Sequence, residues 1–207
     1  MTDSIFETFA DYLEQSDYPK GKKKIMESAV ELFASNGYNG ISTLQIAKNA
    51  GLSQATLFKY FKTKEELLVA ILHPVVPGLF VNFFDDLLTY HKTEEMIHFL
   101  VRDRMAFLEK NQALFKIILQ ELLSGQKIKE EEQFIWEMMQ SKLAAVHNRL
   151  LEDPRVNPDL TPFQLIRISA GPLIAYFGQL CVVGKNDGIR EEEFIILEKQ
   201  ILAGLWK

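Results

Sequence analysis

The sequence predicts an all-α fold, and three observations lead to this prediction. Apolar residues recur at positions i, i+3, i+4 and i+7 through almost the whole chain. Alternating runs of Val, Ile and Thr are few, and no Asn-Gly or Asp-Gly turn lies between such runs. Hydrophobic residues make up 47% of the 207 residues, which is enough to form a substantial core.

A short amphipathic helix is expected over residues 4–15. Ser4 and Glu7 have the spacing of a capping box, in which each side chain binds the backbone N–H of the other residue. The helix is expected to end before Pro19. It is acidic, because residues 1–17 carry five Asp or Glu and no Lys or Arg.

A second helix is expected over residues 22–36. Four apolar residues at helical spacing should face inward: Ile25, Ala29, Leu32 and Phe33. Gly37 follows, and a glycine at this position commonly ends a helix in the left-handed conformation.

Two very short helices come next. The first begins near Ser42, which has capping-box spacing with Gln45, and the second covers residues 54–61 with Ser53 as its N-cap. The segment 51–53, which contains a glycine, forms the turn between them. Two short helices joined by such a turn are the geometry that places the second helix in the major groove of DNA.

The helix after this motif begins with another capping box, formed by Thr63 and Glu66. Pro74 and Pro77 are expected to end or kink it, because proline lacks the backbone N–H that a helix interior needs. A boundary between two domains is therefore expected near residue 73.

The remainder of the chain is expected to be helical as well. The expected helices cover residues 80–90, 93–109, 111–123, 127–152, 161–183 and 190–206. The fifth of these has a well-specified start, because Thr161 caps it, Pro162 occupies its first position and Gln164 completes a capping box.

Charge is distributed unevenly along the chain. The net charge is −5, yet residues 18–64 carry eight Lys against only Glu27 and Glu31, and the rest of the chain after them carries 15 basic and 21 acidic residues. A local basic excess is expected of a surface that contacts phosphate, although a solvated lysine-rich face is the alternative.

Three features favour a soluble, cytoplasmic protein with no membrane partner and no cofactor. Every apolar run of eighteen residues or more contains a charge, and the acidic start at residues 1–4 differs from a signal peptide. The single Cys181 cannot form an internal disulfide and has no Cys or His at zinc-ligand spacing, so it is expected to be a core residue.

Residues 41–67, ISTLQIAKNAGLSQATLFKYFKTKEEL, resemble the signature of the TetR family of bacterial transcriptional regulators. The preceding residues 32–38, LFASNGY, also match the family's approach to the motif. The resemblance covers about residues 22–70, and the C-terminal two thirds agrees with the family only in helix number and length.

The resemblance implies a set of DNA contacts. Thr43 would contact a phosphate, while Gln54, Ala55 and Thr56 would approach base edges, where Gln can pair with adenine and a Thr or Ala methyl can contact the thymine methyl. The remaining phosphate contacts would come from Lys59, Tyr60 and Lys64. An ordinary surface role is the alternative for each.

Two features depart from the family pattern. Phe58 stands where a tyrosine is common, so a hydroxyl contact to the DNA backbone is lost there. The acidic helix at residues 4–15 replaces an arm that is usually short and basic. We expect it to fold back onto the protein, by simple packing or by a self-inhibiting contact with the basic patch.

The resemblance also implies a homodimer, formed by the last two helices of each chain. The helix at 161–183 has a surface of small residues, Ala170, Gly171, Ala175 and Gly178, and the last helix has an apolar face of Ile195, Ile196, Leu202 and Leu205. An intrachain core would explain the same residues. A dimer would bind a palindromic operator in double-stranded DNA.

Family members commonly bind a small-molecule effector among their middle helices. The residues proposed to contact a lipophilic ligand here are His98, Arg102, Phe107, Phe115, Trp136, His147 and Tyr176, and plain core packing is the alternative for the aromatic ones. The expected domains are an acidic helical extension (1–19), a helix-turn-helix DNA-binding domain (20–73) and a ligand-binding and dimerisation domain in a helical bundle (74–207).

The expected function is that of a repressor released from its operator by a ligand. An all-α enzyme is the main alternative from another class, but no di-iron Glu-x-x-His pattern, phosphate-binding glycine loop or nucleophile motif occurs, so the protein is not expected to be an enzyme and no metal site is expected. A third possibility is a protein of this fold that acts through a protein partner or binds many DNA sites architecturally.

Overall fold

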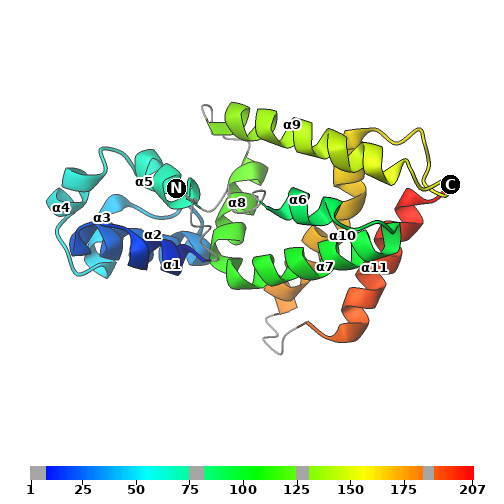
Figure 1. The fold of residues 1–207 in the computed structure, drawn as a ribbon. Helices are drawn as coiled ribbons and strands as arrows, with labels where there is room; N and C mark the ends of the chain where they lie inside the picture. Colours follow the sequence, from blue (N-terminus) through cyan, green and yellow to red (C-terminus); the bar gives the residue numbers. More distant parts are fainter. Residues whose placement is uncertain (1–7, 75–81, 125–130, 184–188) are drawn as a thin grey trace. The chain divides into compact units, whose positions relative to one another are not determined.

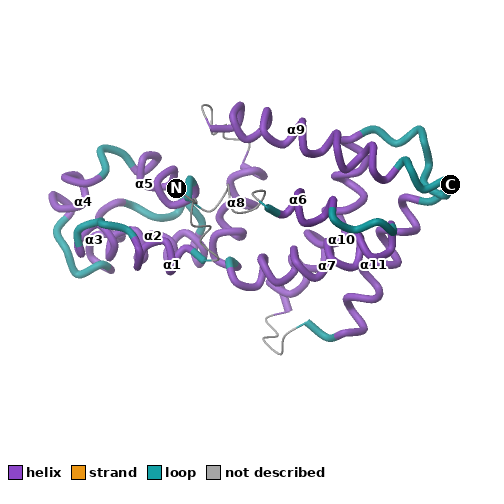
Figure 2. The backbone as a smooth tube through the Cα atoms, viewed as in Figure 1, coloured by secondary structure: helices purple, strands orange, loops and turns teal. Residues whose placement is uncertain are grey.

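The structure is a computed structural model that describes residues 8–74, 82–124, 131–183 and 189–207, with the side chains of residues 121–139 and 182–188 left out. Within these residues the chain forms eleven α-helices and no strand, apart from an isolated bridge between Val156 and Trp206 (Figures 1 and 2). The prediction of an all-α fold is confirmed.

The helices follow the order expected from the sequence. The first five are α1 (Phe9–Gln15), α2 (Lys20–Asn36), α3 (Thr43–Asn49), α4 (Gln54–Tyr60) and α5 (Lys64–Leu72). The remaining six are α6 (Phe83–Leu88), α7 (Thr93–Lys110), α8 (Gln112–Ser124), α9 (Glu131–Leu150), α10 (Pro162–Val183) and α11 (Glu191–Leu205). Helix α5 ends just before Pro74, as the missing N–H of proline predicts.

The N-caps of the helix-turn-helix are the ones the sequence predicts. Ser42 and Gln45 form both bonds of a capping box at the start of α3, and the Ser53 hydroxyl accepts from the backbone N–H of Thr56. The start of α5 differs from the predicted capping box in one bond. Thr63 Oγ1 accepts from the backbone N–H of Glu66 as expected, but Glu66 Oε2 accepts from the backbone N–H of Lys62 at 2.7 Å and not from that of Thr63.

Helix α1 is shorter than the segment predicted from the sequence. It starts at Phe9, because Thr8 has an extended backbone and forms a capping box with Asp11. The predicted cap at Ser4 and Glu7 lies outside the described residues. The prediction of one continuous helix from residue 4 is therefore wrong at Thr8, because Thr8 is an extended N-cap and not a helical residue.

By internal packing the chain divides into two compact units. The first contains residues 1–79 and 110–129, and the second contains residues 80–109 and 130–207. The division near residue 79 lies close to the boundary expected at 73. Helix α8, which the sequence placed beyond that boundary, packs against α2 in the first unit. The extents of the DNA-binding and ligand-binding domains remain predictions.

Helix α2 is the centre of the first unit, where α3, α4, α5 and α8 pack against it (Figure 1). Ile25, Ala29 and Phe33 are fully buried as expected, but the predicted inward Leu32 is partly exposed and Met26 is buried instead. Gly37 ends α2 with φ 76° and ψ 153°, so its φ is positive but its ψ is extended rather than left-handed helical.

The second unit is formed by α6, α7, α9, α10 and α11. Helix α9 packs against α6 and α10, and α10 packs against α11 and continues through Pro172. The end of the chain is held by the loop after α9, because the Asn157 N–H donates to the Leu205 carbonyl at 2.9 Å and the Lys207 N–H donates to the Arg155 carbonyl at 3.0 Å.

Candidate nucleic-acid interface

The turn between α3 and α4 is tight and is closed by backbone hydrogen bonds. The Leu52 N–H donates to the Ala47 carbonyl at 2.9 Å, and the Gly51 N–H donates to the Lys48 carbonyl at 3.1 Å. Gly51 has φ 69°, a conformation that favours glycine because it has no Cβ. The chain therefore turns sharply enough for α4 to follow α3 as an independent short helix.

Both helices of the motif are anchored by one buried face. Ile46 and Ala47 of α3 and Leu57 of α4 are fully buried. A buried hydrogen bond adds to this packing, because the Ser28 hydroxyl of α2 donates to the Ile46 carbonyl at 3.0 Å. The opposite faces of α3 and α4 are therefore held outward on a rigid support.

The structure brings two of the predicted contact residues together. Gln54 Nε2 donates to Thr43 Oγ1 at 2.9 Å, which links the first turns of α3 and α4. Ala55 is exposed next to Gln54, and the Thr56 hydroxyl lies 2.8 Å from the Ser53 hydroxyl. The first turn of α4 therefore presents short polar and methyl groups whose own positions are fixed by local bonds.

Tyr60 and Lys59 lie at the other end of α4. Lys59 is exposed, whereas Tyr60 is partly buried against α2. A Cβ added at Gly21 would lie 3.2 Å from the Tyr60 hydroxyl and 3.3 Å from its ring, so the absence of a side chain at Gly21 makes room for the tyrosine. The start of α2 thus positions Tyr60.

Lys64 makes contacts within the protein that the sequence did not predict. Its Nζ donates to the carbonyls of Tyr38 and Ile41 at 2.8 and 2.9 Å, and it lies 4.0 Å from the centre of the Tyr38 ring. Two of the three ammonium N–H groups are used in this way. Lys64 therefore ties α5 to the loop after α2, and a phosphate contact would have to compete with these bonds.

Two apolar side chains at the surface of this motif were not assigned as contacts from the sequence. Leu44 of α3 is 58% exposed and Phe58 of α4 is 46% exposed. Phe58 departs from the family pattern because it lacks a hydroxyl, whereas nothing in the sequence marks Leu44, since one apolar residue in a short helix is ordinarily a core residue.

Helix α1 and the start of α2 form an aromatic and cationic contact. The hydroxyl groups of Tyr12 and Tyr18 lie 2.8 Å apart, and Lys22 Nζ lies 3.7 Å from the centre of the Tyr18 ring. Burial and the hydrogen bond with Tyr18 raise the pKa of Tyr12 to about 12. Lys23 Nζ donates to the Glu14 carbonyl at 3.2 Å, so the acidic helix does fold back onto the start of α2.

Three of the residues predicted to contact an effector make polar contacts within the second unit. His98 Nδ1 lies 3.0 Å from Glu198 Oε1, and Arg102 pairs with Glu191, so these two join α7 to the surface of α11. His147 Nε2 lies 2.6 Å from the Leu160 carbonyl. Carboxylates of α11 therefore already contact the polar groups of His98 and Arg102.

The aromatic members of that set belong to different helices. Phe107 lies beside Arg104, at 5.4 Å between the guanidinium carbon and the ring centre, in the second unit, and Phe115 belongs to α8 in the first unit. Tyr176 is partly buried, and burial raises its pKa. The side chain of Trp136 lies outside the described residues.

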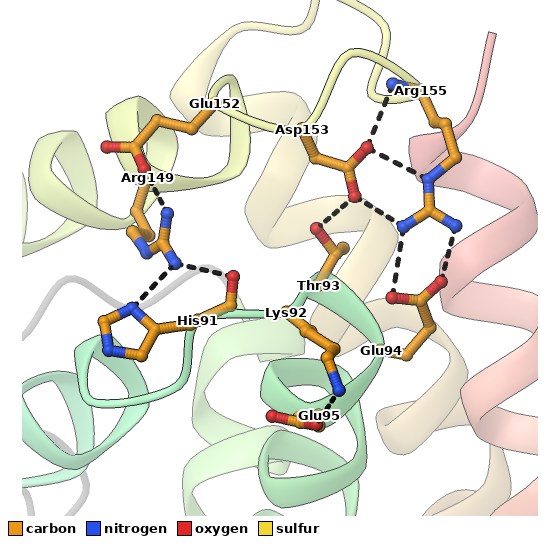
Figure 3. A pocket seen from close by; sticks show the side chains of 9 residues that line it. All are labelled: His91, Lys92, Thr93, Glu94, Glu95, Arg149, Glu152, Asp153 and Arg155. Carbon is orange, nitrogen blue, oxygen red and sulfur yellow. Dashed lines mark hydrogen bonds and ion pairs between the residues drawn. The ribbon is translucent and has the colours of Figure 1, made fainter.

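A polar hollow of about 650 Å³ lies in the second unit (Figure 3). It lies where the start of α7 meets the end of α9, and its lining residues are His91, Lys92, Thr93, Glu94, Glu95, Arg149, Glu152, Asp153 and Arg155. These charged groups largely bind one another.

Arg155 is the centre of this charge network. It binds Glu94 at 2.6 Å and Asp153 at 2.7 Å, and the Thr93 hydroxyl donates to Asp153 at 2.8 Å (Figure 3). The Arg155 hydrogen bonds hold the pKa of Asp153 well below its usual range. Arg149 closes the other side by donating to the His91 carbonyl at 2.6 Å. The network therefore ties the loop after α9 to the start of α7.

Helices α10 and α11 expose an apolar face. Phe163, Ile174, Ile195 and Ile196 are 63%, 37%, 43% and 48% exposed. Apart from neighbouring residues and the backbone of the same helix, no described atom lies within 4 Å of a Cβ added at Gly171 or Gly178. Leu205, which the sequence placed on the same face, is 1% exposed and belongs to the intrachain core, and Leu202 is partly exposed.

The described residues contain no cluster of three or more His, Cys, Asp or Glu that could hold a metal ion. None of the helices in the described part of the chain is long and apolar enough to cross a membrane.

A short helix held outward after a glycine turn, packed against α2 and α3 with lysines around it, defines a helix-turn-helix protein. Residues 25–71 match the family described as "Bacterial regulatory proteins, tetR family". The N-terminal segment of this chain is therefore similar to the DNA-binding segment of TetR-family regulators, and its overall fold resembles that of solved TetR-family structures.

Two kinds of relative support this assignment. The "Fatty acid metabolism regulator protein" of Bacillus subtilis is 42% identical over 48 residues, which are 23% of this chain and 25% of that protein. The chain therefore matches only about a quarter of the length of this curated relative.

Solved structures agree over much more of the chain. A TetR family transcription regulator from Marinobacter aquaeolei VT8 covers 91% of this chain and 96% of its own, with a TM-score of 0.70 and 22% identity. The transcriptional regulator FadR from Bacillus subtilis in complex with stearoyl-CoA covers 87% and 95%, with a TM-score of 0.61 and 21% identity. At these identities the likeness shows the fold.

Proposed function

We propose that this protein is a homodimeric transcriptional repressor that binds a palindromic operator and is released by a small lipophilic ligand. The observation that carries the proposal is the outward face of α3 and α4, where Gln54 is bound to Thr43 and Lys59 is exposed. This face combines a side chain that can read adenine with charge that can contact phosphate.

The basic charge supports a phosphate-rich partner rather than an acidic protein. Exposed lysines at positions 48, 59 and 62 surround the outward face of the motif. In DNA binding, each lysine-phosphate contact releases a counterion, so the affinity falls as salt rises. A salt-dependent affinity is therefore expected of this surface.

The first experiment is selection of DNA fragments by the purified protein at two salt concentrations. Wild type is compared with the Thr56→Ala/Tyr60→Ala variant, and we expect recovery of a palindrome by wild type alone. Recovery of many fragments that share no palindrome would instead favour architectural binding at many sites or action through a protein partner. If nothing is enriched, the helix-turn-helix has no DNA-binding role.

A matched pair of lysine variants tests the phosphate contacts on the selected fragment. Lys59→Ala should reduce the slope of log affinity against log salt by about 1, because one contact is lost. Lys92→Ala removes the same charge from an exposed lysine of the second unit and should leave the slope unchanged. Equal slopes for the two variants would show that Lys59 does not contact a phosphate of the DNA.

The exposed face of α10 and α11 supports the homodimer. Ile195 and Ile196 expose apolar surface that a second copy would bury, and the open space at Gly171 and Gly178 allows a close approach of helices. Ile195→Lys should give monomers in analytical ultracentrifugation, while Leu44→Lys places the same charge outside this face and should leave a dimer. Dimeric Ile195→Lys protein would show that another surface carries the association.

A ligand among the helices of the second unit completes the proposal. The FadR structure holds stearoyl-CoA, which motivates long-chain acyl compounds as the first to test. A ligand weakens DNA binding only by its differential affinity for the two conformations. We expect a long-chain acyl-CoA to release the selected fragment, with coenzyme A alone as the control. Unchanged DNA affinity would exclude this ligand class but not the repressor itself.

No enzymatic activity is part of the proposal. Several relatives that match this chain are named as regulators, and the charged groups in the hollow of the second unit bind one another rather than converging on a substrate position.

A further inference from the structure

Leu44 and Phe58 are the large apolar side chains that the described part of the first unit leaves exposed. The four other large apolar side chains with comparable exposure, Phe163, Ile174, Ile195 and Ile196, all lie on α10 and α11. Leu44 and Phe58 therefore form a separate apolar feature, on the helix-turn-helix itself.

Both residues lie next to the contact that joins α3 to α4. Leu44 directly follows Thr43, whose hydroxyl accepts from Gln54. Phe58 lies four residues after Gln54, which places it one turn further along the same side of α4. Ala55, three residues before Phe58, is exposed as well. The outward face of the motif therefore carries apolar groups beside its polar ones.

The surroundings of these two side chains identify the chemistry of the partner. Lys48 is four residues after Leu44 on α3, Lys59 follows Phe58 on α4, and both lysines are exposed. A partner that fits must offer apolar groups between negative charges. The major groove of DNA has one such apolar group, the C5-methyl of thymine, and phosphates flank it on both sides.

We propose that Leu44 and Phe58 contact thymine C5-methyl groups in each operator half-site. This inference rests on the proposed DNA-binding function and adds residues that determine its specificity. Burial of a group of methyl size is worth ~0.8 kcal/mol, which corresponds to about fourfold in Kd for each methyl contact.

The test uses duplexes of the DNA fragment that wild-type protein selects, with each thymine replaced in turn by uracil. Uracil keeps the hydrogen-bonding groups of thymine and lacks only the methyl. We expect wild type to lose about fourfold in affinity at one or more positions of each half-site. Leu44→Ala should abolish the penalty at its own position and keep the one at the Phe58 position, and Phe58→Ala should do the reverse.

Leu44→Met is the matched control, because it keeps an apolar side chain of similar length and should keep the uracil penalty. Both alanine substitutions fall on exposed side chains, so helical circular dichroism should not change. Equal affinity of wild type for thymine and uracil duplexes at every position would overturn the proposal while leaving the repressor function intact. Absence of a selected fragment would instead overturn the DNA-binding function on which it rests.

Discussion

The hydrogen bond from Ser28 to the Ile46 carbonyl gives the sharpest test of how α2 supports the helix-turn-helix. Ser28 is 5% exposed, and its hydroxyl donates at 3.0 Å to the Ile46 carbonyl at the middle of α3. Ser35 lies on the same helix, but its hydroxyl is exposed and donates at 2.8 Å to the Glu31 carbonyl within α2 itself. The same substitution, Ser to Ala, can therefore be made with and without loss of a tertiary bond.

The expected magnitude follows from comparing the two variants. Each gains the higher helix propensity of alanine, so that contribution largely cancels in the difference. The Ile46 carbonyl keeps its helical bond from the Ala50 N–H at 3.0 Å, so no buried acceptor is orphaned. What remains is the net value of one hydrogen bond, about 1 kcal/mol, or roughly a fivefold change in an equilibrium constant.

Amide hydrogen exchange of the peptide that covers α3 measures this effect locally, at one protein concentration for all variants. The amides of α3 should exchange about five times faster in Ser28→Ala than in Ser35→Ala, because α3 opens more often. The amides of α10 and α11 should exchange at equal rates in the two variants. The reasoning is refuted if α3 is equally protected in both variants, because the bond to Ile46 would then contribute nothing beyond packing.

Three more contacts can be tested by substitution or titration. Gly21→Ala should lower affinity for the selected DNA with little change in stability, because the added Cβ would lie 3.3 Å from the Tyr60 ring and displace that ring. The Gly21→Ala/Tyr60→Ala double variant should bind the DNA no more weakly than Tyr60→Ala alone. Arg155 lowers the folded-state pKa of Asp153, so this pair stabilises the protein above the usual carboxyl pKa near 3.8 and the contribution is lost as pH falls below it. The free energy of unfolding, measured with urea, should therefore fall less steeply with decreasing pH in Asp153→Asn than in wild type. An equal pH dependence in the two proteins would contradict the pairing. The pKa of Tyr12 is raised from 10.0 to about 12, so its contribution to folding stability is present below pH 10 and is lost between pH 10 and 12. In an ultraviolet titration, the wild type should show a tyrosine that ionises late, and Tyr12→Phe should lack it. Ionisation of every tyrosine of the wild type near pH 10 would contradict the contact.

Local signals in the sequence predicted the helix-turn-helix well. Ser42, Gln45 and Ser53 cap their helices as expected, since a cap needs only residues within one turn of one another. The turn at Gly51 is equally local. The identity of the motif therefore did not depend on the rest of the molecule.

The roles of long side chains were harder to predict. Lys64 stands at a helix start suited to an anion, but Lys64 reaches two carbonyls of a loop more than twenty residues away in sequence. His98 and Arg102 were expected at a ligand, yet they pair with carboxylates of α11. No spacing rule within α7 could show those partners.

Sequence alone thus determined the helical class, the helix-turn-helix and the basic character of residues 18–64, because periodicity, caps and local charge are properties of neighbouring residues. Tertiary structure alone decided that α8 packs with the first unit, that Leu205 is core while Ile195 is exposed, and that Leu44 and Phe58 stay at the surface. Apolar residues at helical spacing look alike in a sequence, and only the packing of one helix against another decides which of them are left for a partner.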